Sequence, residues 1–301
     1  MATRSKWQRL ATEAVNPRSR GIDTMAPDDI VEMMILDNRA VLAAVQREKP
    51  HIARGAELIA DVILKGGRII FAGAGTSGRL GVLEAAELPP TFGIDPATAL
   101  AIMAGGAAAV HRAKEGVEDD FKAGQRAMRG VRPSRGDVVI GISASGVTPF
   151  VRGALVNARA AKARLIAITC APRSEIADFA DVSIELVVGP EVIAGSTRLK
   201  AGTATKIALN MLTTAAMVRA GKTYGNLMVD VKSNSDKLRD RARRITTTVT
   251  GLDDDEADAL LRRARWNVKA AILMQQTGVT RADALSRLRV EPRLRQLLGG
   301  R

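Results

Sequence analysis

The chain contains few of the residues that build disulfides, metal sites or stacking surfaces. Its 301 residues include one cysteine, two histidines, two tryptophans, one tyrosine and five phenylalanines. The single cysteine, Cys170, excludes an intramolecular disulfide, and His51 and His111 have no metal-site spacing with it or with each other. Scarce aromatic residues disfavour a stacking platform for single-stranded nucleic acid. We expect a protein that uses no metal and no cofactor.

Long hydrophobic runs are also missing. No stretch reaches the roughly 18 apolar residues that a membrane-spanning helix needs. The first residues, Met1 to Trp7, lack the continuous apolar core of a secretion signal. We therefore expect a cytoplasmic protein with no membrane partner.

Positive charge is in excess, with a formal net charge of +13. From Lys232 to the end there are 16 Lys and Arg against 9 Asp and Glu, so 16 − 9 = +7 lies in this part. A basic field attracts either nucleic acid or a phosphorylated substrate. Because no aromatic residues interleave with the basic ones, solvated arginine-rich helices are favoured and a nucleic-acid partner is not.

The pattern of apolar residues divides the chain into three parts. Residues 1–60 are expected to form a helical arm, residues 61–235 an α/β domain, and residues 250–301 a small three-helix module. In the middle part, apolar strands that alternate with helices predict a mainly parallel sheet flanked by helices on both faces. The expected strands are 68–71, 100–103, 137–142, 165–169 and 182–188. The expected helices include one from near 196 to 221 and shorter ones at 257–265, 268–275 and 281–289.

A loop rich in glycine and hydroxyl groups, residues 73–78, follows the first expected strand directly. Glycines let the backbone turn tightly and approach a ligand. The amides at the start of the next helix, with the hydroxyls of Thr76 and Ser77, can donate hydrogen bonds to an anion. The loop predicts a small-molecule site.

Two other functions of this glycine pattern are disfavoured. Gly73, Gly75 and Gly78 match the dinucleotide-binding fingerprint, but the next strand leads into Ala104-Gly105-Gly106 instead of the acidic residue that holds a ribose. A P-loop is disfavoured because no Gly-Lys-Ser/Thr follows.

The helix after this loop carries Glu84 and Glu87 and is expected to end before Pro89-Pro90. Carboxylates three residues apart share one helix face, as do those at 115–119. Taken alone, both groups fit ordinary solvated faces as well as acid/base chemistry.

A second strand leads into a similar loop, residues 143–149. Pro149 suits the first helical position and Thr148 the N-cap, which places the hydroxyls at the positive end of a helix. Two such loops at one edge of a sheet can converge on one sugar phosphate. The alternative is that the hydroxyls only cap helices.

Several blocks in order along the chain resemble the N-acetylmuramic acid 6-phosphate etherases. The blocks are 16–18, 73–81, 89–91, 115–119, 143–146, 195–203 and 225–230. The resemblance implies a three-layer sugar isomerase fold, a homodimer and a phosphorylated amino sugar substrate. The implied reaction cleaves the D-lactyl ether of N-acetylmuramic acid 6-phosphate to N-acetylglucosamine 6-phosphate and D-lactate.

The resemblance also implies roles for residues. The resemblance implies that Glu87 and Glu118 are the catalytic pair. Within the pair, we expect Glu87 to donate a proton to the departing lactate and Glu118 to be the base at C2. The implied substrate-binding residues are Thr76, Ser77, Gly78, Ser143, Ser145, Gly146, Thr148, Ser196 and Lys200. For Lys200, a solvated lysine in the first turn of a helix is an equal alternative.

Two positions depart from the family pattern. Val147 stands where an arginine is frequent, and Ala171 where an asparagine is frequent. Losing a cation near the second loop is expected to weaken anion binding. Two other functions fit similar loops, namely a non-catalytic sugar-phosphate regulator and an aldose-ketose isomerase.

Overall fold

The computed structural model describes residues 10–299 in two compact units. The first unit comprises Met1–Ala85 and Ala99–Thr214, and the second comprises Ala86–Thr98 and Ala215–Arg301. Residues 1–9 of the expected N-terminal arm lie outside the described residues. No helix in the described range is long and apolar enough to span a membrane.

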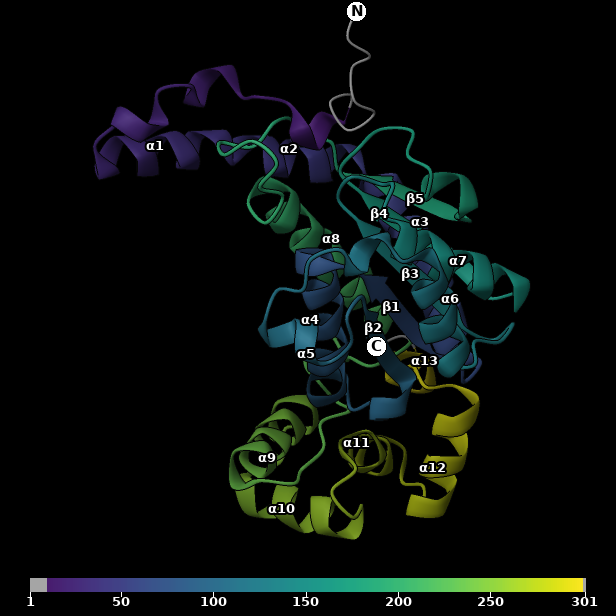
Figure 1. The fold of residues 1–301 in the computed structure, drawn as a ribbon. Coiled ribbons are helices and arrows are strands. Elements are labelled where there is room, and N and C mark those ends of the chain that lie inside the picture. Colours follow the sequence, from purple (N-terminus) through teal and green to yellow (C-terminus); the bar gives the residue numbers. More distant parts are fainter. Residues whose placement is uncertain (1–9, 300–301) are drawn as a thin grey trace, which may run out of the picture. The chain divides into compact units, whose positions relative to one another are not determined.

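The first unit is built on a parallel sheet of five strands in the order β2-β1-β3-β4-β5 (Figure 1). The strands are β1 (Ile69–Gly73), β2 (Ala99–Met103), β3 (Val138–Ser143), β4 (Arg164–Thr169) and β5 (Val182–Glu185). All five were predicted to within a few residues, and the parallel arrangement is confirmed. Because β1 pairs with β3, with Gly73 opposite Ile142, the loops that follow these strands leave the sheet side by side.

Alternate side chains of each strand pack against helices on opposite faces of the sheet. On one face, Ile70 and Val139 belong to a core with Phe150 and Leu155. Phe150 and Leu155 come from α7 (Pro149–Ala160), which packs with α6 (Phe121–Gly130). On the other face, Phe71 lies against Gly81 of α4 (Gly75–Phe92). Because both faces are covered, the central strands β1 and β3 are buried along their whole length, whereas the edge strand β5 alternates buried and half-buried residues.

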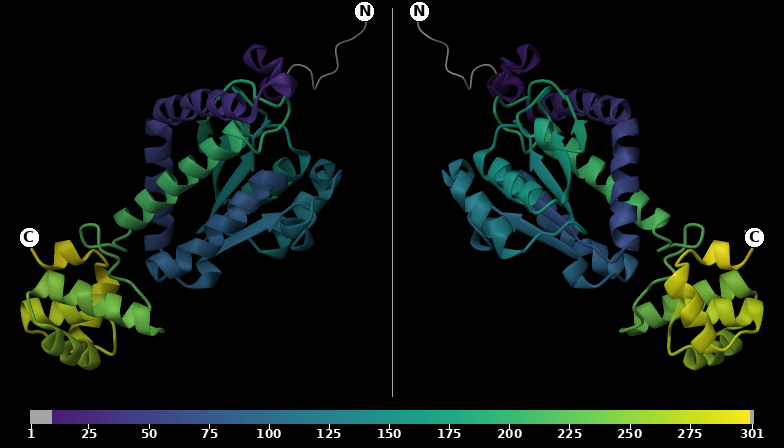
Figure 2. Two further views of the ribbon diagram at one scale, coloured as in Figure 1. Left: turned by 90° about the vertical axis from the view of Figure 1, so that its left-hand side faces the viewer. Right: turned by 90° about the vertical axis from the view of Figure 1, so that its right-hand side faces the viewer.

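Two further helices complete the second face of the sheet, α3 (Lys49–Leu64) and α8 (Lys200–Arg219). A Cβ on Gly55 of α3 would lie 2.8 Å from Leu212 of α8 and 3.5 Å from Ile166 of β4, so helices and sheet meet closely here (Figure 2). Upstream of α3 lie α1 (Pro27–Asp37) and α2 (Arg39–Arg47). α1 begins at Pro27 after Ala26, with Asp28 and Asp29 in its first turn, and it belongs to the helical arm expected over residues 1–60.

The expected end of α4 before Pro89-Pro90 is wrong, because the helix continues through both prolines to Phe92. Proline fixes φ near the helical value, so its cost is lost hydrogen bonds and crowding of the preceding turn. Burial of Leu88 and Phe92 offsets that cost. The helix ends at Gly93, whose φ of +66° favours glycine.

The second unit is helical. It contains α9 (Asp236–Thr250), α10 (Asp254–Arg263), α11 (Val268–Thr277), α12 (Arg281–Val290) and the short α13 (Leu294–Leu297). The three predicted short helices correspond to α10, α11 and α12. Leu260, Leu261, Ile272 and Leu273 form the centre of its core. A capping box of Asp253 and Glu256 starts α10.

Candidate active site

A cavity of about 330 Å³ lies at the carboxyl ends of the strands in the first unit. Its lining comes from the two predicted loops, the segment after β2, the N-terminal segment and the approach to α8. The lining residues include Thr76, Ser77, Ser145, Thr148 and Glu118, all five of them predicted site residues. In open parallel sheets, ligands bind at this end of the strands.

The first loop is tight because its glycines replace side chains that would collide. A Cβ on Gly73 would lie 2.6 Å from the Gly78 nitrogen, and a Cβ on Gly78 would lie 2.9 Å from the Gly73 carbonyl oxygen. Gly75 has a φ of +53° in open space. Gly78 thus shapes the loop and does not line the cavity.

The first turn of α4 presents hydrogen-bond donors to the cavity. The first intrahelical bond is donated by the Gly78 amide to the Ala74 carbonyl, at 3.1 Å. The amides of Gly75, Thr76 and Ser77 precede it, and such amides have no intrahelical acceptor. With the hydroxyls of Thr76 and Ser77 they form a site suited to a phosphate.

The second loop is held by its own hydroxyl groups. Ser143 is buried, and its Oγ lies 2.6 Å from Thr148 Oγ1 and accepts from the Gly146 amide at 3.1 Å. Thr148 is the N-cap of α7, as predicted, but its side chain makes no capping hydrogen bond. The hydroxyls of Ser143 and Thr148 therefore bond within the loop, and the Thr148 hydroxyl does not cap the helix. Ser145 and Thr148 line the cavity, whereas Ser143 and Gly146 support them.

Arg79 holds the segment that carries Glu118. Its guanidinium donates to the carbonyls of Ala109 and Val110, both at 2.8 Å. Downstream, Glu118 lies half-buried in a 3₁₀ turn that begins at Val117. Glu115 and Lys114 also line the cavity. The Glu118 carboxylate therefore shares one cavity with the hydroxyl-rich loops, as acid/base chemistry on a phosphosugar would require.

The two helical glutamates differ from each other. Glu84 is buried and accepts a hydrogen bond of 2.5 Å from Thr213 Oγ1, so a solvated position for it is wrong. Glu87 is exposed, belongs to the second unit and is not among the residues that line the cavity. Its catalytic role stays a prediction based on the family motif.

Lys200 is a structural residue at the start of α8. Its Nζ lies 2.6 Å from Asp37 Oδ2 and donates to the Pro190 carbonyl at 2.7 Å, and the lysine side chain is 5% exposed. A solvated lysine is thus wrong, and Lys200 is not among the cavity-lining residues. Ser196 does not line the cavity either, although its neighbours Gly195 and Thr197 do.

The structure adds cavity residues that sequence reasoning missed. These are Thr12 and Glu13 of the N-terminal segment, together with Thr197 and Lys114. Thr197 lies inside the family block at 195–203, which was a usable signal. Thr12 and Glu13 precede that resemblance in the chain, and no local pattern marks them.

Cys170, at the end of β4, is buried, and burial raises the pKa of its thiol to about 12. A thiol with so high a pKa is not ionised near neutral pH, so Cys170 is not an activated nucleophile.

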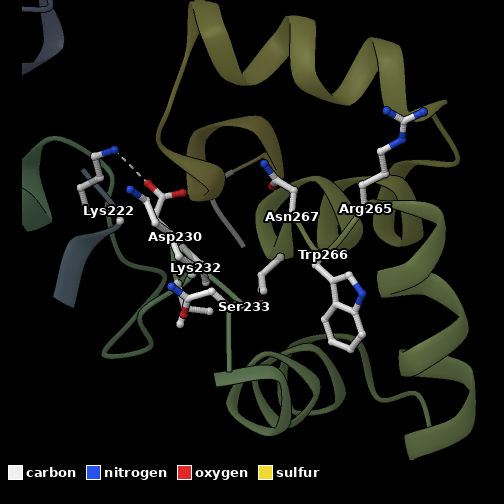
Figure 3. Close-up of a pocket in the computed structure, with 12 residues that line it drawn as sticks. Lys222, Asp230, Lys232, Ser233, Arg265, Trp266 and Asn267 are labelled. Atoms are coloured by element: carbon white, nitrogen blue, oxygen red, sulfur yellow. Dashed lines mark ion pairs between the residues drawn. The ribbon is translucent and has the colours of Figure 1, made fainter. Parts of the chain in front are cut away.

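A second cavity, of about 510 Å³, lies within the second unit (Figure 3). Lys222 and Asp230 point toward one another there, with Nζ and Oδ2 3.1 Å apart. The buried Lys269 pairs with the same carboxylate at 2.9 Å, and burial lowers the pKa of Lys269 despite that partner. This network joins α11 to the segment before α9, which is a structural role.

Comparisons with known proteins match the chain at two scales, by domain models over its middle part and by relatives over nearly its whole length. The model of the glucokinase regulatory protein N-terminal SIS domain matches residues 51–159, and the model of the SIS domain matches residues 125–215. The N-acetylmuramic acid 6-phosphate etherase of Gloeobacter violaceus is 50% identical over 279 residues, 93% of this chain and 91% of the relative. That of Lactobacillus johnsonii is 45% identical over 280 residues, covering 93% and 94%. Among solved structures, phosphoheptose isomerase of Neisseria gonorrhoeae is similar with a TM-score of 0.48 and 19% identity, over 63% of this chain and 97% of that one.

Proposed function

This chain belongs to the N-acetylmuramic acid 6-phosphate etherase family, and we propose that it cleaves the D-lactyl ether of N-acetylmuramic acid 6-phosphate. The products are N-acetylglucosamine 6-phosphate and D-lactate, as expected of an enzyme that recycles cell-wall amino sugars. The observation that carries the proposal is the position of Glu118, which lines the same cavity as the hydroxyl-rich loops after β1 and β3.

The phosphate is proposed to bind between the two loops. The first turn of α4 supplies amides, and Thr76, Ser77, Ser145 and Thr148 supply hydroxyls. Two helix N-termini, of α4 and α7, add favourable partial charge for an anion. Ser143 and Gly146 contribute by fixing the second loop, and a sugar held there shares the cavity with Glu118.

The proposed reaction is an elimination followed by hydration. Glu118 takes the proton from C2, which the neighbouring aldehyde makes acidic, and the C3–O bond breaks as the C2–C3 double bond forms. Glu87 gives a proton to the departing lactate oxygen. Water then adds across the double bond, with its oxygen at C3 and a proton returning to C2. General acid/base catalysis of this kind is worth about 10²–10⁴-fold in rate.

Two finer properties belong to the same proposal. We propose a cytoplasmic location and a homodimer. The homodimer is supported by apolar side chains that α1 and α2 expose and that a second copy would cover. Val31 is 55% exposed, Ile35 64% and Leu42 65%. Large exposed apolar surfaces mark interaction sites.

A non-catalytic sugar-phosphate regulator is the second candidate function. The match of residues 51–159 to a domain of glucokinase regulatory protein favours it. Such a protein needs the phosphate loops but no base. An aldose-ketose isomerase would need the loops and a base, and it would leave the ether intact. The identity of the product separates the three.

The test is mass-spectrometric detection of both products after incubation with N-acetylmuramic acid 6-phosphate. We expect the native chain to release D-lactate and Glu118→Gln to lose about 10³-fold in kcat, because a general base is removed. Glu87→Gln is expected to fall similarly, and Glu32→Gln, an exposed carboxylate of α1, serves as control. A native chain that binds the phosphosugar without releasing lactate would identify a regulator. Conversion to a ketose with the ether retained would identify an isomerase.

A further inference from the structure

The N-terminal segment contributes two polar side chains to the cavity, and neither has a role in the reaction proposed above. Thr12 and Glu13 form a 3₁₀ turn that starts at Ala11 and line the cavity with the two phosphate loops. Thr12 is 5% exposed, and its Oγ1 has no hydrogen-bond partner among the described residues. A buried hydroxyl without a partner is costly and rare in native proteins, so a ligand that supplies the partner is the simplest reason to keep one.

The N-terminal segment and the first residue of α8 bind the same backbone carbonyl, that of Pro190. Asn16 is buried, its Oδ1 accepts from the Arg18 amide at 3.0 Å, and its Nδ2 donates to the Pro190 carbonyl at 3.4 Å. The Lys200 ammonium donates to that same carbonyl. Glu191 accepts from the amides of Lys200 and Ala201 at the start of α8, at 3.0 and 2.9 Å. The segment that carries Thr12 and Glu13 is therefore held at the cavity by its hydrogen bond to Pro190, in the stretch of chain that leads into α8.

The chemistry of the two side chains indicates which part of a ligand they meet. Glu13 lies against the backbone of Gly195, since a Cβ there would be 3.1 Å from Glu13 Oε2. An ionised carboxylate only accepts hydrogen bonds, so it pairs with hydroxyl or amide donors and repels a phosphate. A threonine hydroxyl both donates and accepts. The loops after β1 and β3 already supply donors for a phosphate.

We propose that Thr12 and Glu13 bind the hydroxyl and acetamido groups of the amino sugar, and that they select the sugar while the loops hold its phosphate. The inference rests on the proposed function, because it takes a phosphorylated amino sugar as the ligand. It makes the N-terminal segment a part of the active site that determines specificity.

The experiment measures binding of N-acetylglucosamine 6-phosphate and of inorganic phosphate to the full chain by calorimetry, together with kcat and KM for ether cleavage. The variants are Thr12→Val, Thr12→Ser and Glu13→Gln, with Glu32→Gln as a control outside the cavity. Losing one hydrogen bond to a ligand is expected to weaken phosphosugar binding about tenfold in Thr12→Val and Glu13→Gln. Phosphate binding should change less than about twofold, and Thr12→Ser should retain affinity because it keeps the hydroxyl.

A stability readout separates binding from a structural role. Because Thr12 Oγ1 has no hydrogen-bond partner within residues 10–299, the thermal midpoint of Thr12→Val is expected to be unchanged or higher than that of the native chain. A lower midpoint with unchanged phosphosugar affinity would overturn the inference. An equal loss of phosphate binding would overturn it too. So would a fall in kcat of about a hundredfold in Glu13→Gln at unchanged affinity, because that result marks a group acting in the chemical step.

The behaviour of the native chain shows whether the proposed function or only the role of the N-terminal segment fails. If it cleaves the ether and Thr12→Val and Glu13→Gln behave as the native chain does, only the role of the N-terminal segment is refuted. If the native chain binds no phosphosugar and releases no lactate, the proposed function fails, and the inference fails with it.

Discussion

The two loops that meet at the cavity follow neighbouring strands and lead into helices on opposite faces of the sheet, and they are stabilised differently. The loop after β1 is shaped by backbone packed against backbone, with Gly73 and Gly78 in mutual contact. The loop after β3 is shaped by side chains, through the hydroxyls of Ser143 and Thr148. The first loop therefore keeps its hydroxyls free for a ligand, whereas the second uses part of its hydroxyl set to hold itself together.

The largest expected effect that tests this comparison comes from adding a methyl group to each loop. We expect Gly73→Ala to lower the free energy of unfolding by about 3 kcal/mol, because its Cβ would collide with backbone that cannot move aside. Gly146→Ala should cost a similar amount, because its Cβ would lie 2.1 Å from Ser174 Cβ and its φ is +73°. Urea unfolding followed by circular dichroism measures both changes. Gly75→Ala, strained but in open space, should cost only about 1 kcal/mol.

A second variant makes the difference between the loops sharper. Adding Ser174→Gly to Gly146→Ala removes the nearest colliding side chain and should restore part of the stability. The strain of a positive φ and a contact of 2.9 Å with Thr169 Oγ1 remain. No single side-chain deletion can rescue Gly73→Ala. Equal behaviour of the two loops in this test would contradict the division into backbone-shaped and side-chain-shaped loops.

The next largest effect concerns the hydroxyl groups. Ser77→Ala should weaken binding of a phosphosugar by about tenfold and leave stability unchanged, since its hydroxyl has no partner in the first loop. Ser143→Ala should weaken binding and also destabilise the protein by about 1 kcal/mol, because the Thr148 hydroxyl loses its partner and the Gly146 amide keeps only the Ser143 carbonyl as acceptor. Calorimetry and urea unfolding measure the two properties. Thr203→Ala, an exposed hydroxyl of α8, is the matched control.

The smallest expected effect is a gain in the second loop. Val147 precedes the N-cap of α7, where the family resemblance leads us to expect an arginine, and Val147→Arg would add a cation beside the proposed phosphate position. We expect phosphosugar affinity to rise about threefold, and the gain to shrink at high salt because exposed charges are screened. Val147→Gln, which is polar but uncharged, should not show the gain. Tighter binding by both variants would point to packing instead of charge.

Local patterns in the sequence were sufficient for most of the fold. The strands were predicted because the sheet is buried on both faces and each strand is an apolar run, as at 138–143. The phosphate loops were predicted because glycines, hydroxyls and Pro149 have strong local preferences. The end of α4 was predicted wrongly because burial of Leu88 and Phe92 outweighs the helix-breaking tendency of two prolines.

The candidate site was only partly predictable. Thr76, Ser77, Ser145 and Thr148 follow buried strands, so the parallel topology alone brings them together. Lys200 was placed in the site because it lies in a family block, but its charge is used in a buried pair with Asp37. That pair joins residues 163 positions apart, since 200 − 37 = 163, and no local pattern indicates such a partner.

The sequence by itself determined the parallel sheet, the helical C-terminal part, the two hydroxyl-rich loops and the resemblance that carries Glu87 and Glu118. Each of these depends on short-range preferences of the backbone or on the order of motifs. The tertiary structure decided which polar groups face the cavity and which are consumed in the interior. It buried Glu84 against Thr213, paired Lys200 with Asp37, and brought Thr12 and Glu13 to the phosphate loops. The physical reason is that burial and the choice of hydrogen-bond partner depend on segments distant in the chain, whose meeting is decided only when the sheet and its helices pack.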